Sequence, residues 1–144
     1  MLTVLFCASV LVVMCVGIHY QSLMTLSRLN RKKQSRQRWR INILILGALA
    51  THVVEMSLFS LGYALLCRND WCGHIQDAAG EASTDYFYFS FVVFTSLGFG
   101  DLTPVGSIRM MTALETLTGL VLIGWTASFL FVEMQHWAEN NLAE

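Results

Sequence analysis

The segment Thr95-Ser96-Leu97-Gly98-Phe99-Gly100-Asp101 carries glycine at two alternate positions. Glycine reaches backbone angles that other residues avoid, so alternating glycines suit an extended backbone whose carbonyl groups all point to one side. The hydroxyl of Ser96 adds one more oxygen at one end of this row. Stacked oxygens of this kind can replace the water shell of a monovalent cation. The segment therefore predicts a backbone that binds cations.

A short aromatic run, residues 86–96, leads into this segment. It is too short to cross a bilayer as a helix, which takes about 20 residues, and it suits a re-entrant or buried segment. Ser83, Thr84 or Asp85 can cap the start of such a helix. We expect a helix over residues 85–96 whose C-terminal end, with its partial negative charge, favours a cation in the segment that follows.

Long apolar runs on both sides indicate the class of protein. The chain of 144 residues is 55% hydrophobic and 13% charged, whereas soluble domains carry about 25% charged residues. Residues 1–20, 41–66 and 107–132 are each long enough to cross a bilayer as a helix. The first run has neither a basic start nor a small-residue cleavage site, so we expect a retained helix and not a signal peptide. The expected fold class is an all-α membrane protein with three transmembrane helices, a re-entrant pore helix and a loop.

The distribution of basic residues predicts the orientation. Seven of the nine Lys and Arg residues lie within residues 21–40: Arg28, Arg31, Lys32, Lys33, Arg36, Arg38 and Arg40. By the positive-inside rule this loop and the 133–144 tail are cytoplasmic, the N-terminus lies outside and residues 67–84 are extracellular. The cluster could also bind anionic lipid head groups, whereas its intervening Gln, Ser and Asn residues do not fit a voltage sensor. The net charge of −1 gives no reason to expect a nucleic-acid partner.

Two cysteines, Cys67 and Cys72, lie in the expected extracellular loop. They could form a local disulfide if the loop faces an oxidising compartment, or they could remain free thiols. His74 follows them, but no second ligand pair does, so a zinc site has weak support.

Residues 95–101 resemble the Thr-x-Gly-Tyr-Gly-Asp signature of potassium channels, in a variant with Leu97 and Phe99, and residues 102–106 resemble the turn after that filter. The whole resembles small bacterial ion channels with a two-helix pore, here with an extra N-terminal helix. The resemblance implies a pore domain over residues 41–132, a filter at 96–101 and a passive K+ channel in a cell membrane, such as the bacterial inner membrane. It implies no catalytic residue and no cofactor besides permeant K+. One pore-like segment per chain means that several chains must close the pore, and we expect a homotetramer.

The resemblance also assigns roles to residues. The ion path would be lined by Thr95, Ser96, Leu97, Gly98, Phe99 and Gly100, with K+ held by the backbone carbonyls of residues 96–99 and by the Ser96 hydroxyl. Tyr88 and Asp101 would support the filter through a hydrogen bond. Gly119 and Gly124 would serve as hinge or packing positions of the inner helix. The residues at 96, 97 and 99 depart from the usual Thr, β-branched residue and Tyr, which leaves a non-selective monovalent cation channel open.

Titratable residues inside the apolar runs need protein partners, because a charge at the bilayer centre costs about 2.5–3.5 kcal/mol or more. His52 and Glu55 lie on one face of the second run, and Glu115 lies at a similar depth in the third. We predict one polar network behind the filter, made of His52, Glu55, Thr112, Glu115 and Thr116. It would be purely structural, or it would also make conduction sensitive to pH.

Two other classes of protein stay open at this point. One is an intramembrane enzyme that uses His52, Glu55 or Glu115, with Ser57 as a nucleophile. The other is a non-conducting assembly subunit or sensor. The glycine-containing segment favours the channel over both.

Overall fold

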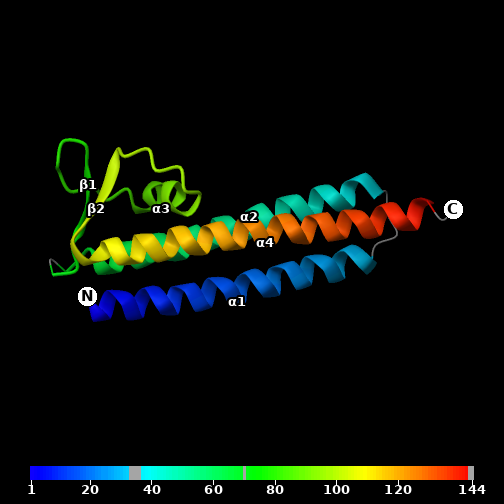
Figure 1. Cartoon of the computed structure of the whole chain (residues 1–144), viewed down its shortest axis with the longest axis horizontal. Helices are drawn as coiled ribbons and strands as arrows, with labels where there is room; N and C mark the ends of the chain where they lie inside the picture. Colours follow the sequence, from blue (N-terminus) through cyan, green and yellow to red (C-terminus); the bar gives the residue numbers. More distant parts are fainter. Residues whose placement is uncertain (33–36, 70, 143–144) are drawn as a thin grey trace.

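Three long helices run side by side along the molecule (Figure 1). The computed structural model describes the backbone of residues 1–32, 37–69 and 71–142, and the side-chain surroundings of residues 1–29, 39, 41–69 and 71–136. The long helices are α1, Leu2–Lys32, α2, Gln37–Leu66, and α4, Arg109–Leu142. They contain three apolar stretches long enough to cross a membrane: Leu2–Leu29, Ile41–Leu66 and Gly106–His136. A helix satisfies its own backbone hydrogen bonds in lipid, and the chain is a multi-pass membrane protein.

Helix α1 packs against both α2 and α4. Its Ala8 and Cys15 are fully buried in the interface. At Gly62 of α2, an added Cβ would lie 2.7 Å from Cδ1 of Leu11 and 2.6 Å from Cε of Met111 on α4. Small residues at such positions let membrane helices approach closely. The extra N-terminal helix is therefore an integral part of the helix packing.

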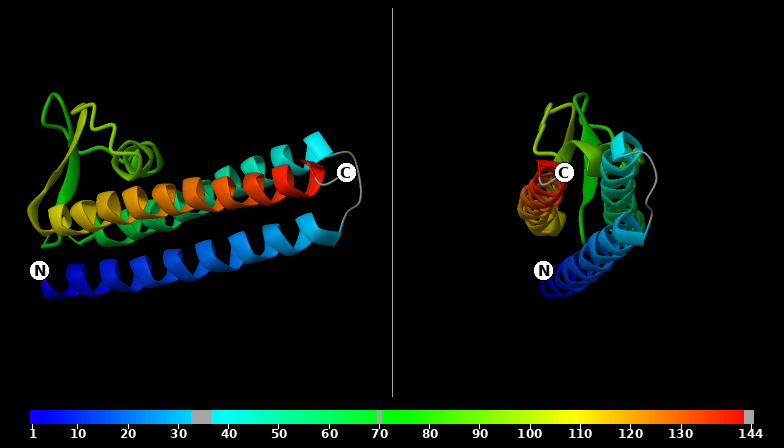
Figure 2. Two further views of the ribbon diagram at one scale, coloured as in Figure 1. Left: turned by 45° about the vertical axis from the view of Figure 1, so that its right-hand side comes forward. Right: turned by 90° about the vertical axis from the view of Figure 1, so that its right-hand side faces the viewer.

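The short helix α3, Tyr86–Phe94, lies on the side of the α2–α4 pair away from α1 (Figures 1 and 2). Its Phe89 and Phe94 side chains are buried. The ring of Tyr63 on α2 meets Phe89 edge-on, with ring centroids 5.1 Å apart, a favoured geometry for aromatic pairs. As expected from its length, α3 is a packed helix that does not span the molecule.

A two-stranded antiparallel sheet, which the sequence did not predict, joins the segments on either side of α3. Strand β1, His74–Asp77, pairs with β2, Leu102–Val105, so that His74 lies opposite Val105 and Asp77 lies opposite Leu102. The Ile75 side chain is fully buried. A single 3-10 turn, η1, Gly106–Ile108, then leads into α4. Strands of four residues are too short to show a clear alternating pattern in the sequence.

The predicted basic loop over residues 21–40 is largely helical instead. Helix α1 continues to Lys32, and α2 begins at Gln37. Residues 18–46 contain no glycine or proline, so helical hydrogen bonding continues beyond the apolar stretch. Arg28 is exposed, whereas the other six basic side chains of the cluster lie outside the described side chains. The proposed lipid contact therefore stays a prediction.

Two further helix ends differ from the predicted ones. Helix α4 continues to Leu142, through most of the predicted 133–144 tail, and α3 is shorter than the predicted 85–96. A hydropathy pattern marks where a chain can enter lipid, and a helix continues past that point when no residue breaks it. The three apolar stretches long enough to cross a membrane agree better with the prediction than the helix ends do.

Cys67 and Cys72 are free thiols in the structure. Cys72 is fully buried, and burial raises the pKa of the Cys67 thiol above its usual range. Both side chains pack as small apolar groups beside the sheet. The disulfide that the sequence left open is not formed.

Candidate functional site

The segment after α3 begins with a tight turn that ends the helix. The Thr95 hydroxyl donates to the carbonyl oxygen of Phe91 at 2.7 Å. The backbone N–H of Leu97 donates to the carbonyl oxygen of Val92 at 3.0 Å. Ser96 then takes a φ of 60°, which stops the helix, because a helix needs negative φ at each residue. The C-terminal end of α3 therefore points directly into residues 96–100.

The sign of the backbone φ angle alternates along residues 96–100. The φ angles of Ser96, Gly98 and Gly100 are 60°, 55° and 79°, whereas Leu97 and Phe99 keep negative φ. In a β-strand, which keeps one sign of φ, successive carbonyl groups point to opposite sides. Reversing the sign at every second residue turns successive carbonyl groups toward one side. This is the backbone that the glycine spacing predicts.

One chain leaves this segment uncovered. Residues 95–101 are all exposed, and the apolar side chains of Leu97 and Phe99 are 60% and 66% exposed. An added Cβ at Gly98 or Gly100 would meet no atom within 4 Å. A row of oxygens with no facing partner binds an ion on one side only. The segment of one chain thus has one open face.

Tyr88 and Asp101 hold the C-terminal end of the segment against α3. The Tyr88 hydroxyl donates to Oδ2 of Asp101 at 2.7 Å, and this hydrogen bond raises the pKa of Tyr88. The structure brings together the pair that the sequence analysis singled out. Asp101 in turn leads directly into β2, so both ends of the segment are fixed to ordered elements.

Gly119 and Gly124 of α4 lie in different surroundings. An added Cβ at Gly119 would lie 2.1 Å from the carbonyl oxygen of Phe94, the last residue of α3. At Gly124 it would meet no atom within 4 Å. Gly119 is therefore a packing position that lets α3 approach α4, whereas the close surroundings of Gly124 place no restriction on a side chain.

The intramembrane polar residues form two clusters and not the one network that we predicted. The first cluster, which we call the Glu115 cluster, consists of Tyr63, Ser90, Thr112 and Glu115. The Tyr63 hydroxyl donates to Oε2 of Glu115 at 2.5 Å and lies 3.3 Å from the Thr112 hydroxyl. Ser90 of α3 bonds to Oε1 of Glu115 and to the carbonyl oxygen of Met56 at 2.8 Å. Fully buried Glu115 thereby links α2, α3 and α4.

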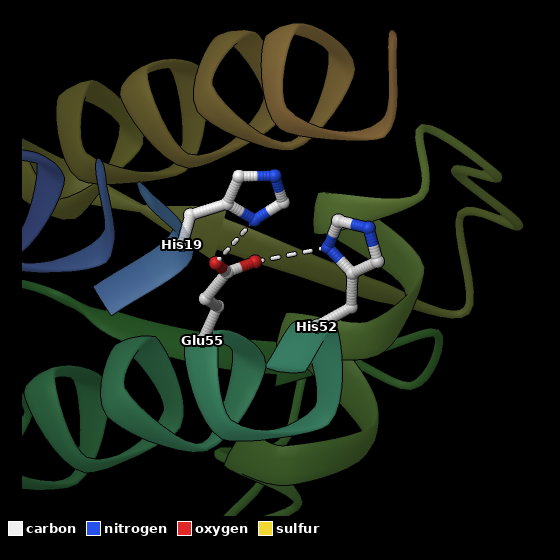
Figure 3. A group of neighbouring side chains, drawn as sticks. All are labelled: His19, His52 and Glu55. Atoms are coloured by element: carbon white, nitrogen blue, oxygen red, sulfur yellow. Dashed lines mark hydrogen bonds and ion pairs between the residues drawn. The ribbon is translucent and has the colours of Figure 1, made fainter. Parts of the chain in front are cut away.

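The second cluster, the Glu55 cluster, consists of His19, His52, Glu55 and Thr126. Nδ1 of His19 and Nδ1 of His52 each lie 2.9 Å from a different oxygen of Glu55 (Figure 3). Nε2 of His52 lies 3.0 Å from the Thr126 hydroxyl. The sequence analysis missed His19, although a titratable residue inside the first apolar run was a signal that it needed a partner.

The two carboxylates turn to opposite sides of the α2–α4 pair, which is why the predicted single network is wrong. Glu55 reaches His19 on α1, and Glu115 reaches Ser90 on α3. The predicted similar depth does hold, since Ser90 joins Glu115 to the carbonyl of Met56, the neighbour of Glu55. The hydroxyl of Thr116 donates to the carbonyl of Thr112 in its own helix at 3.0 Å. Among the described contacts it belongs to neither cluster.

Ser57, the nucleophile of the enzyme alternative, is not part of either cluster in the described residues. Its side chain is exposed, and its hydroxyl donates to the carbonyl of Val53 at 2.7 Å. His52 and Glu55 face the helix interface instead. The catalytic group that the alternative needs is not assembled by these side chains.

Comparison with known proteins agrees with the geometry of the segment. Residues 43–136, from α2 to the last third of α4, match the family described as ion channel. The chain belongs to the ion channel family. The family match indicates transport of ions and not catalysis, and it includes residues 95–101 together with both polar clusters except His19, which lies on α1.

Two curated proteins are similar to this ion channel. It is 29% identical over 115 residues to the inward rectifier potassium channel Kirbac3.1 of Paramagnetospirillum magnetotacticum, covering 78% of this chain and 32% of that protein. It is 34% identical over 83 residues to the uncharacterized membrane protein YdjJ of Bacillus subtilis strain 168, covering 56% of this chain and 24% of that protein. The aligned part thus spans only 32% and 24% of the length of these relatives. No solved structure matches the chain significantly.

Proposed function

We propose that this ion channel is selective for potassium and conducts K+ passively through a homotetrameric pore. The observation that carries the proposal is the alternation of φ at Ser96, Gly98 and Gly100. It turns the backbone carbonyls of an uncovered segment to one side, where K+ would replace its water by oxygen ligands. The similarity to a protein named as a potassium channel supports the choice of ion.

The proposed ligands are the carbonyl oxygens of Ser96, Leu97, Gly98 and Phe99, with the Ser96 hydroxyl at the inner end. Thr95 and Gly100 would border the path. Helix α3 ends at Phe94, directly before this row, so its C-terminal partial negative charge favours a cation there. No cofactor other than the permeant ion enters the proposal.

The assembly follows from the open face of the segment. Cyclic symmetry closes a ring of identical chains, and four copies of the oxygen row would surround an ion on all sides, as in known K+ filters. The exposed side chains of Leu97 and Phe99 would then be covered by neighbouring chains. A ring of this kind explains why apolar side chains flank a polar backbone on one chain.

Three contacts would hold the filter in shape. The Tyr88–Asp101 hydrogen bond fixes its outer end. The Glu115 cluster and the close approach at Gly119 fix α3 to the long helices. By the positive-inside rule, α3 enters from the outer side and the basic end of α1 and α2 is cytoplasmic.

The test is a recording from the purified protein in a planar bilayer with K+ on one side and Na+ on the other. A reversal potential near the K+ equilibrium value is the expected result. A reversal potential near zero with a clear current would favour the non-selective cation channel, and Ser96, Leu97 and Phe99 would be the residues to revert to the usual potassium-channel residues. A folded, reconstituted protein that passes no cation current would contradict the proposal and favour a non-conducting subunit.

A further inference from the structure

The Glu55 cluster lies in the interface between α1 and the α2–α4 pair, and the family match leaves out its His19 because that match begins at residue 43. Glu55 and His19 are fully buried, and His52 is 8% exposed. Burying such groups is costly, and apolar residues of similar volume would often hold two helices together at least as well. The cluster therefore calls for an explanation beyond helix packing.

We propose that His19, His52 and Glu55 are the ligands of one zinc-like divalent metal ion. Each side chain offers one ligand atom, and the three atoms lie within 4.8 Å of one another. Both Nδ1 atoms already point at the same carboxylate (Figure 3). Zinc bonds of about 2.0–2.2 Å place ligand atoms about 3.3 Å apart. Small side-chain rotations would bring the three atoms to that spacing.

The partner of the outer ring nitrogens supports the assignment. Oγ1 of Thr126 lies 3.0 Å from Nε2 of His52 and 3.3 Å from Nε2 of His19. A histidine that binds metal through one nitrogen usually donates its other N–H to an oxygen. With metal on both Nδ1 atoms, both Nε2–H groups donate to the two lone pairs of Thr126. The hydroxyl thus fits the tautomer that metal binding imposes on both rings.

The ligand set indicates the kind of ion. Two imidazole nitrogens and one carboxylate oxygen suit zinc and neighbouring transition metals, whereas Mg²⁺ and Ca²⁺ prefer oxygen ligands. Three protein ligands leave a fourth position of a tetrahedral ion for water. The ion is therefore chemically distinct from the K+ that the filter would bind.

A cleft between α1 and α2 lies near the site. Its volume is about 320 Å³, and it is lined by Gln21, Ser22, Thr25, Leu26, Gly47 and Thr51. Ser22 lies one helical turn after His19, and Thr51 directly precedes His52. The hydroxyl and amide groups among its lining residues can hydrogen-bond water. A bound ion would bridge α1 and α2.

The experiment measures metal in the purified, chelator-stripped full-length protein after addition of Zn²⁺ or Co²⁺. We expect one ion per chain. Each of the variants His19→Gln, His52→Gln and Glu55→Gln should bind more than about 100-fold more weakly, because losing a ligand costs more than losing an outer hydrogen-bond partner. His74→Gln is the matched control, since His74 is exposed on β1, and it should bind as the unmodified protein does.

X-ray absorption of the Zn²⁺-loaded unmodified protein covers the case in which the variants fail to fold. The spectra of the unmodified protein and of His74→Gln should both show two imidazole ligands. A folded protein that takes up no metal overturns the proposal. Undiminished binding in folded His19→Gln or His52→Gln, or a spectrum without imidazole, overturns it as well.

Discussion

Ser96, Gly98 and Gly100 all adopt the left-handed backbone region, but the conformational cost is larger for serine than for glycine. Glycine has no Cβ and adopts this region freely, whereas a residue with a side chain loses about 1–2 kcal/mol. Ser96 accepts that cost at the one position of the row where a hydroxyl can add an ion ligand. Strained residues tend to gather where function requires them.

The variant Gly100→Ala should abolish the current while the protein still assembles, because a Cβ disfavours the φ of 79° at this residue by about 1–2 kcal/mol. Planar-bilayer current and size-exclusion elution measure the two effects. The matched control is Gly80→Ala, since Gly80 has a φ of 85° and equally open surroundings but lies in the loop between β1 and α3. Equal loss of current in both variants would contradict a specific role for residue 100.

At the scale of the elements, α3 makes two specific contacts with the long helices in addition to its apolar packing, one through the backbone and one through side chains. Gly119 lets the end of α3 lie against α4, and Ser90 joins Glu115 and the carbonyl of Met56. Both contacts are buried and leave little room for adjustment. Each can be weakened by a single substitution.

Gly119→Ala should lower the thermal midpoint of the assembled protein in detergent, because the new Cβ meets a backbone carbonyl at 2.1 Å and overpacking costs about 1–3 kcal/mol. Gly124→Ala should melt near the unmodified protein, since its Cβ meets nothing within 4 Å. If Gly119→Ala melts normally and only the open probability changes, Gly119 acts as a hinge and the packing role is wrong.

Ser90→Ala should destabilise the protein by about 1–3 kcal/mol, because the buried Glu115 carboxyl and the Met56 carbonyl lose a hydrogen-bond partner. Thermal unfolding followed by circular dichroism measures the effect. Ser57→Ala serves as the comparison, since the exposed Ser57 hydroxyl bonds within its own helix, and surface changes usually stay within about 0.5 kcal/mol. Equal midpoints for the two variants would show that the Glu115 cluster does not hold α3.

The elements that the sequence predicted are those that a local pattern specifies. Short stretches of sequence were enough to predict three features: the apolar stretches, the short aromatic helix and the glycine alternation at residues 98 and 100. The pairing of β1 with β2 and the contact between His19 and Glu55 join residues far apart in the chain, and no local pattern reveals such partners. The sequence analysis also placed the carboxylates of Glu55 and Glu115 in one network, because the sequence alone does not show to which side of α2 or α4 a side chain turns.

At the scale of the whole molecule, one chain leaves residues 95–101, the proposed ion path, exposed. Chemical cross-linking of the purified protein in mild detergent should therefore give a ladder of bands that ends at the tetramer, because four copies would close the proposed ring. Light scattering of the same sample supplies an independent mass. A monomer or dimer that still conducts in a bilayer would contradict the fourfold architecture.

The β1–β2 pairing connects the loop of residues 67–84 mechanically to residues 95–101, the proposed ion path. Asp77 is paired with Leu102, the residue that follows Asp101. A force on β1 is therefore transmitted through backbone hydrogen bonds to the C-terminal end of residues 96–100. The same pairing joins the chain on both sides of α3 into one closed loop, which reduces the conformational freedom of that loop. A large molecule that bound β1 would thus strain the proposed ion path without touching it.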